Sequence, residues 1–152
     1  MSLDIDAVVN AIASHAAASG WFGQVNLHEP KSATGTGLTA AVFFSRLGPM
    51  PAASGLAATT TRVELTVRIY QNMLMEPQDM IDPQVVKACD ALIAAYTGDF
   101  TLGGLIRDVD CLGSSGTPLS ARSGYLNLAG QLQRIIDITV PCIVNDTYPQ
   151  SP

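Results

Sequence analysis

The sequence predicts an α+β fold in which a mixed, mostly antiparallel β-sheet carries two amphipathic helices packed on one face. The first observation is the alternation of apolar and polar side chains over residues 59–73, which is typical of a half-buried strand. The second is a pair of segments, residues 2–20 and 82–98, in which apolar side chains recur at helical spacing. The third is size and composition: 152 residues with 47% apolar content suffice for one buried core, so a single domain over residues 1–152 is predicted.

The strand predicted over residues 59–73 is the centre of the sheet. Its apolar face, which suits the core, consists of Val63, Leu65, Val67 and Ile69. Its opposite face, which suits water or a partner, consists of Arg62, Glu64, Thr66, Arg68 and Tyr70. Burial of the four apolar side chains stabilises the fold by roughly 6 to 12 kcal/mol before chain entropy is subtracted. A strand needs neighbouring strands and a covering layer to keep that gain, and the remaining segments are predicted to supply both.

The first predicted helix covers residues 2–20. Ser2 is placed to cap it, and Asp4 and Asp6 in its first turn complement the positive end of the helix dipole. Gly20 is predicted to end it. Its apolar stripe consists of Ile5, Val8, Val9, Ile12 and Ala16.

Two strands and two loop segments are predicted before the central strand. Residues 21–28 and 38–47 have strand composition, and residues 29–37 are rich in turn formers. Residues 48–58 contain two prolines and no charged side chain, so they are predicted to project as a loop outside the core. Met50 and Leu56 give this loop the apolar character of a contact arm, although a mobile hairpin connection explains the same composition.

The second predicted helix covers residues 82–98. Asp82 is placed as its N-cap, Pro83 at its first helical position and Gly98 at its end. Its buried stripe is predicted to consist of Val85, Val86, Cys89, Leu92, Ile93 and Tyr96. Together the two helices can cover one face of the sheet.

The last third of the chain is predicted to complete the sheet. Residues 107–112 are expected to form a strand and residues 113–124 a flexible loop. A hairpin then turns near Ala129 and Gly130. In its second strand, Arg134, Ile136, Ile138 and Val140 share one face, and Ile135, Asp137 and Thr139 share the other. The polar tail over residues 145–152 is expected to fray or to cross to a neighbouring subunit.

Charge and cysteine content exclude several functions. The net charge is −5 and the eight basic residues form no run, which disfavours a nucleic-acid groove. Cys89, Cys111 and Cys142 are far apart and form no CxxC pair, so they are predicted to be core residues in a reducing compartment. The first nine residues lack the pattern of a signal peptide, and no stretch of about 18 apolar residues occurs. We therefore expect a soluble protein that is made in the cytoplasm and has no membrane partner.

No residue pattern predicts a catalytic, cofactor or metal site. His15 and His28 form no HxxxH or Ser-His-Asp arrangement that the sequence can support. Asp108 and Asp110 are expected to share one strand face, where they could bind a cation, but a solvated or interface face is the favoured explanation. Residues 113–117 resemble a phosphate loop but lack its lysine and a following helix. We therefore assign no cofactor.

The low charge content favours a subunit that covers its surface with partners. Only 14% of residues are charged, whereas about 25% is usual in globular chains. A monomer rich in glycine, alanine and threonine is the alternative. The residues predicted to contact partners are Arg46, Pro49, Met50, Pro51, Leu56, Arg62, Glu64, Arg68, Asp108, Asp110 and Tyr148.

The second half of the chain resembles tail terminator (tail completion) proteins of long-tailed bacteriophages. The resemblance extends from Val67 to Asp146, whereas the first 60 residues resemble the family only in layout. It rests on five clusters in order: VRIYQNMLMEPQDMIDP, LIAAYTGDFTLGG, IRDVDCLGSSGTPLSA, GYLNLAG and IDITVPCIVND.

The resemblance implies a structural virion protein with no catalytic residue. Such a subunit assembles as a homohexameric ring at the head-proximal end of the tail tube, ends tube growth and offers the surface for head attachment. Its partners are then copies of itself, the tail tube protein and neck or connector proteins, with genomic DNA passing through the lumen without specific binding. It is expected in the virion tail, after assembly in the host cytoplasm.

Because an acidic protein without basic clusters does not grip phosphates, we expect Asp and Glu to outnumber Lys and Arg on the lumen. A neck or head-completion protein, a tail tube subunit and a small enzyme remain alternatives. A pocket that brought His28 together with Asp108 and Asp110 would favour the enzyme.

Overall fold

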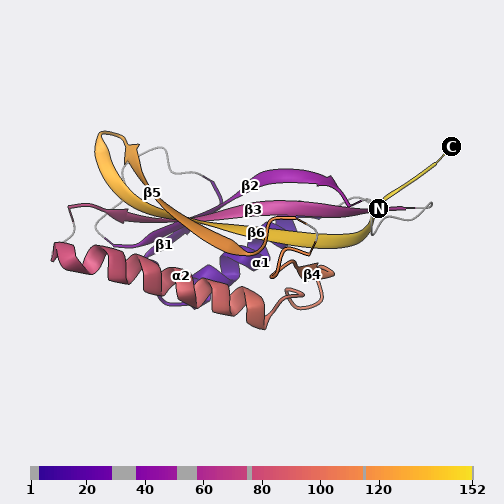
Figure 1. The fold of residues 1–152 in the computed structure, drawn as a ribbon, viewed down its shortest axis with the longest axis horizontal. Coiled ribbons are helices and arrows are strands. Elements are labelled where there is room, and N and C mark those ends of the chain that lie inside the picture. Colours follow the sequence, from indigo (N-terminus) through magenta and orange to yellow (C-terminus); the bar gives the residue numbers. More distant parts are fainter. Residues whose placement is uncertain (1–3, 29–36, 51–57, 75–76, 115, 152) are drawn as a thin grey trace.

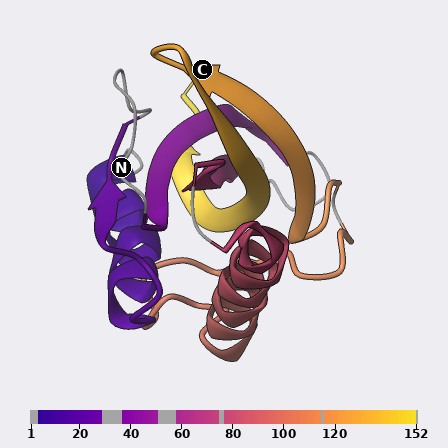
Figure 2. The same ribbon diagram turned by 90° about the vertical axis from the view of Figure 1, so that its left-hand side faces the viewer.

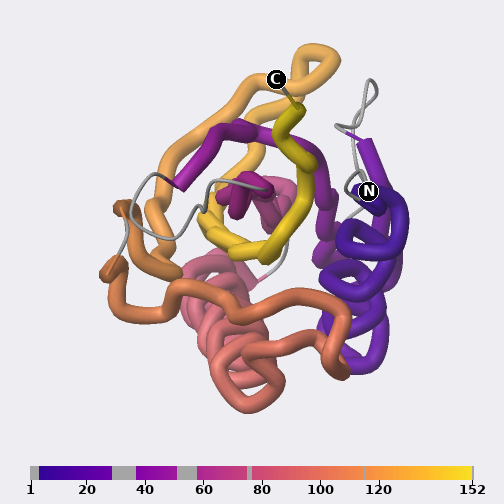
Figure 3. The backbone as a smooth tube through the Cα atoms, turned by 90° about the vertical axis from the view of Figure 1, so that its right-hand side faces the viewer, coloured from indigo at the N-terminus to yellow at the C-terminus, as the bar shows by residue number. Residues whose placement is uncertain are grey.

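The computed structural model describes residues 4–28, 37–50, 58–74, 77–114 and 116–151. Two helices lie on the same side of a mixed, mostly antiparallel sheet (Figure 1), as the sequence predicts. The sheet is strongly curled rather than flat when it is viewed along its strands (Figure 2). The turn between the last two strands lies on the side of the molecule opposite the second helix, as Figure 3 also shows.

Within the described residues, the helices and strands follow one another as α1 (Ile5–Ala18), β1 (Gln24–Asn26), β2 (Thr39–Pro49), β3 (Ala58–Asn72), α2 (Ile81–Gly98), β4 (Asp108–Val109), β5 (Ser120–Leu128) and β6 (Gln131–Pro149). A 3-10 turn, Gln78–Met80, precedes α2. The strand order is β1-β2-β3-β6, and the outer edge of β6 carries β5 along its first half and β4 further on. β1 pairs in parallel with β2, and the other pairs are antiparallel.

The core lies between the helices and the predicted apolar face of β3. Val67 is opposite Val42 of β2 and Ile138 of β6, and all three side chains are fully buried. The helices contribute the other half of the cluster, and the hydroxyl of Tyr96 on α2 donates to the carbonyl of Ile12 on α1 at 3.0 Å. Alternation in β3 and helical spacing therefore identified both sides of this core.

The other sheet face is not uniformly polar, contrary to the prediction. Tyr70 was expected to face water or a partner, but it is 1% exposed and packs with Ala41 and Ile135. Leu126 and Leu128 of β5 pack against this second cluster. Because the sheet is curled, neighbouring strands shield part of its open face.

The helix ends differ from the predicted caps. Asp4 is the N-cap of α1 and accepts a hydrogen bond from the Ala7 amide at 3.2 Å, whereas Ser2 lies outside the described residues. α2 begins one residue before Asp82, because the 3-10 turn leads directly into it. The Asp82 carboxylate instead accepts from Nε of Arg134 at 3.0 Å. The predicted stripe of α2 is buried except for Val86, which is 57% exposed, and Ile93, which is partly buried.

Several segments predicted to be loops belong to strands. β2 continues to Pro49, β5 begins at Ser120, and β6 continues to Pro149 rather than fraying from residue 145. Residues 51–57 of the predicted projecting loop lie outside the described residues. The predicted strand over residues 107–112 is limited to Asp108–Val109. The long β3 explains the extensions, because β2 and β6 find backbone partners along most of its length.

A candidate interaction surface at the end of the sheet

Most of the predicted contact residues gather where β3 and β6 run on past the end of α2 (Figure 1). In register, Arg46 lies opposite Glu64, Pro49 opposite Thr61, and Thr59 opposite Tyr148. We call this region, residues 46–50, 58–64 and 143–149, the distal end of the sheet. The antiparallel register brings these residues together, although they come from three distant parts of the chain.

An ion cluster centred on Arg62 organises the distal end. The Nη1 atom of Arg62 donates to Oδ2 of Asp110 at 2.7 Å, and its Nε atom donates to Oε1 of Glu64 at 3.3 Å. Its Nη2 atom donates to the carbonyl oxygen of Thr117. The side chains of Arg62, Glu64 and Asp110 are only 11%, 12% and 6% exposed. Three residues predicted to contact partners therefore bind one another within the chain.

The segment that follows β4 folds onto this cluster. Oδ1 of Asp110 accepts from the Ser114 amide at 2.9 Å, and the Leu119 amide donates to the Asp110 carbonyl at 3.2 Å. Gly113 has φ +73°, and a Cβ atom there would lie 2.7 Å from the carbonyl oxygen of Gly116. The predicted flexible loop is thus, in its described part, a turn held by Asp110 and Arg62.

The surface of the distal end carries a small hollow of about 30 Å³, lined by Arg46, Gly48, Pro49, Arg62 and Glu64. Of these, Arg62 and Glu64 pair with each other, and Arg62 also pairs with Asp110, which lies outside the lining. The exposed Arg46 is the cross-strand neighbour of Glu64 and adds a compensating positive charge at the rim. The hollow is about the size of one water molecule and therefore suits a side-chain tip rather than a metabolite.

The remaining predicted contact residues have different environments. Met50 was predicted on a projecting arm, but it is 7% exposed and its amide donates to the Thr60 carbonyl at 2.8 Å. Tyr148 is 38% exposed and available for contact. Asp108 lies 3.6 Å from Nε of Arg107. Pro51 and Leu56 lie outside the described residues.

Arg68 lies on the same sheet face but away from the distal end. It forms a two-bond pair with Asp137, with Nε to Oδ1 at 2.6 Å and Nη2 to Oδ2 at 3.1 Å. Its guanidinium also lies 5.4 Å from the ring centroid of Phe43. Hydrogen bonding to Asp137 raises the pKa of Arg68. Arg68 therefore fastens β3 to β6.

The residues considered for an enzymatic site are not brought together. His28 follows β1 and Asp108 lies in β4, and β2, β3 and β6 separate these strands. Four interstrand steps correspond to about 19 Å. His15 instead contacts Asp99, with Nε2 2.9 Å from Oδ2. Within the described part of the chain, no group of three His, Cys, Asp or Glu side chains is placed to hold a metal ion.

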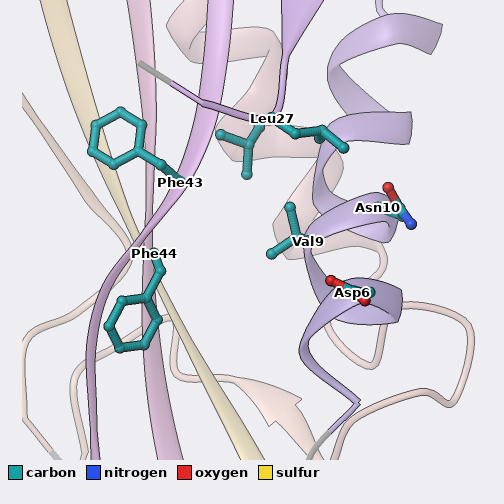
Figure 4. Close-up of a pocket in the computed structure, with 7 residues that line it drawn as sticks. Asp6, Val9, Asn10, Leu27, Phe43 and Phe44 are labelled. Carbon is teal, nitrogen blue, oxygen red and sulfur yellow. The ribbon is translucent and has the colours of Figure 1, made fainter.

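A second surface feature was missed by the sequence reasoning. A groove of about 430 Å³ runs between α1 and β2, lined by Asp6, Val9, Asn10, Leu27, Val42, Phe43 and Phe44 (Figure 4). Phe44 and Leu27 are 53% and 51% exposed. A bulge between Phe44 and Arg46 shifts the register of β2. The sequence signal was the adjacent pair Phe43–Phe44, which breaks the alternation of a strand with one buried face.

Similarity to known proteins is found among solved structures. No protein-family model matches the chain, and no curated protein matches it. Among solved structures, it is similar to a PVC sheath/tube terminator in the extended state, from an extracellular contractile injection system. The TM-score is 0.49 and the sequence identity is 12%, over 99% of this chain. The chain spans 60% of the length of that protein. None of the helices described is long and apolar enough to cross a membrane.

Proposed function

We propose that this chain is a structural tail terminator of a long-tailed bacteriophage. In this proposal, six copies form a ring at the head-proximal end of the tail tube, stop tube polymerisation and provide the surface on which the head docks. Its partners are copies of itself, the tube protein and neck or connector proteins. It carries no catalytic residue, cofactor or metal, and it assembles in the host cytoplasm.

The observation that carries the proposal is the ordered resemblance of five clusters between Val67 and Asp146 to tail terminator proteins. These clusters belong to one packed unit, because β3 and β6 pair along the centre of the sheet while α2 covers the core face. A resemblance spread over contiguous structure supports a shared architecture better than separate surface motifs would.

The distal end of the sheet is the surface we assign to a partner. It combines the exposed side chains of Arg46 and Tyr148 with the hollow, in which Arg62 is already paired with Glu64 and Asp110. Because these charges are already paired, removing water from them leaves no buried ion without a partner. An apolar or hydrogen-bonding partner can therefore cover this surface. We assign this end to the tube or neck protein.

The helical layer and the sheet layer of the fold differ in net charge, and this difference decides which layer could line an acidic lumen. The helical segments and their caps carry Asp4, Asp6, Asp82, Asp90 and Asp99 against Lys87. By register, the sheet face away from the helices carries Arg46, Arg62, Arg68 and Arg122 against Glu64, Asp108 and Asp137, and Asp110 pairs with Arg62 there, so its charges balance. An acidic channel therefore requires the helical layer to line it.

The experiment that tests the function is deletion of the gene from its phage, followed by electron microscopy of the particles. Overlong tubes that separate from heads are expected, with normal tail length restored when the wild-type chain is supplied from a plasmid. Tails of normal length that lack heads would contradict termination and favour a neck or head-completion role.

A further inference from the structure

The sheet has two different long edges on opposite sides. β1 pairs only with Thr39–Ala41 of β2, so the rest of β2 has no strand on its outer side among the described residues. β5 pairs with β6 along all nine of its residues, and no described strand lies on its other side. Unpaired edges of this length are templates for pairing with another chain.

The groove beside β2 continues the position of β1. Leu27, which directly follows β1, lines one part of it, and Val9 of α1 forms the opposite wall (Figure 4). Phe44 of β2 also lines this groove and is half exposed. An extended segment placed there gains backbone hydrogen bonds from β2 and apolar contact from α1.

On this basis, and resting on the proposed ring, we propose that β5 of one copy pairs with the free edge of β2 in the next copy. The strand directions allow this. β2 and β6 are each antiparallel to β3, and β5 is antiparallel to β6, so β5 runs antiparallel to β2. A rotation axis along the strands preserves direction, so the new pair is antiparallel as well.

Side-chain chemistry selects the register in which Tyr125 lies opposite Phe44 of the next copy. The strand register places both side chains on the side of the sheet that faces the helices, and Tyr125 is 60% exposed. Its ring is held 4.5 Å from the guanidinium of Arg134. This register also brings Leu126 opposite Phe43, which pairs two apolar side chains. After the bulge, it puts Arg46 opposite Gly124.

A shorter slide is less favourable. If Ser123 faced Phe44, the bulge would bring Arg46 opposite Arg122, and like charges directly opposite destabilise a sheet. Without any shift, Ala121 would lie opposite Val42, and the three residues after it would lie opposite Thr39–Ala41, which β1 already pairs. In the chosen register only Leu128, the last residue of β5, reaches that stretch. Relative to the row that Val42 and Ala121 share, the chosen register shifts β5 along β2 by about six residues at roughly 3.3 Å each. This shift is spread over four strands that lie about 4.8 Å apart. The strands then tilt by roughly 45°, close to the range of closed β-barrels.

Disulfide trapping tests the register directly. In this pairing Leu47 lies opposite Ser123, and both are exposed, so Leu47→Cys with Ser123→Cys in a Cys111→Ser background leaves the core intact. Under mild oxidation, we expect a ladder of covalent oligomers from the double variant, in purified protein or in assembled tails. A mixture of the two single variants should stop at covalent dimers, because each copy then has only one reactive edge.

The matched control moves one cysteine by one residue. Arg122 projects to the opposite face of the sheet from Ser123, so Leu47→Cys with Arg122→Cys should give far less cross-linking. Equal ladders from both pairs, or no ladder in purified protein and assembled tails alike, would overturn the edge pairing. The tail-length experiment remains independent, since a terminator whose copies meet elsewhere still produces overlong tubes when it is deleted.

Discussion

Removal of the Arg62 guanidinium should destabilise the chain more than removal of any exposed arginine. In Arg62→Leu, the carboxylates of Glu64 and Asp110 remain buried without the cation that now lies 3.3 Å and 2.7 Å from them. Breaking a buried pair by removing one partner costs about 3 to 5 kcal/mol of unfolding free energy. For a chain of this length each kcal/mol lowers Tm by about 2 to 4 °C, so a drop of roughly 6 to 20 °C is expected.

Urea unfolding monitored by circular dichroism measures this difference, and Arg107→Leu is the matched control. The Arg107 side chain is 47% exposed and lies 3.6 Å from its acid, so its loss should cost less than about 1 kcal/mol. A second variant, Asp110→Asn, keeps an oxygen for the Ser114 amide while removing the charge. The double variant Arg62→Leu with Asp110→Asn should therefore be less destabilised than the sum of the single variants. If Arg62→Leu costs no more than Arg107→Leu, the buried cluster does not hold the loop as described.

Three further outcomes follow from the fold. Gly113→Ala should lower the unfolding free energy by about 1 to 3 kcal/mol, because residue 113 has positive φ and its new Cβ would meet a backbone oxygen. Gly98→Ala, with open space around it, should change the unfolding free energy by less than about 1 kcal/mol in the same urea titration. Burial raises the pKa of Cys142 to about 12. A thiol reagent at pH 8 should therefore modify the partly exposed Cys111 in the native protein and Cys142 only after unfolding. Equal rates of modification at the two cysteines, measured by mass spectrometry, would contradict this. A hydrogen bond from the Gly103 amide, together with His15, lowers the pKa of Asp99 below 3.8, so its contribution is present above that pH and is lost as the pH falls through the lower folded value. Tm should consequently fall less between pH 6 and pH 3 in Asp99→Asn than in the wild type, and identical slopes would argue against the contact.

Local sequence patterns predicted the elements better than their ends. Alternation over β3 and helical spacing in α1 and α2 identified the core, because these patterns report directly which face is buried. The extension of β6 through Tyr148 to Pro149 was missed, since it depends on hydrogen bonds to the start of β3, about ninety positions earlier in the chain. From the sequence alone, a polar tail without a known partner strand is predicted to be unpaired.

The candidate surface was predicted in part for a related reason. Strand alternation and loop composition indicated Arg46, Pro49 and Tyr148 as contact residues, and the register brings them to one end of the sheet. The same reasoning placed Arg62 and Glu64 on an open face. Alternation predicts on which face of the sheet a side chain lies, but it does not predict whether another segment covers that face. Their burial depends on the segment containing Asp110, whose course over the sheet leaves no periodic signal in the sequence.

The central ladder between β3 and β6 also governs how this chain reaches its native state. Residues 73–130 separate the two strands, so a long loop must close before the middle of the sheet can form. Contacts of such sequence separation slow folding, and until β6 docks, the fifteen-residue β3 has one flank open to foreign strands. Refolding should consequently be slow and sensitive to protein concentration, and production in cells should benefit from chaperones that shield unfinished sheets.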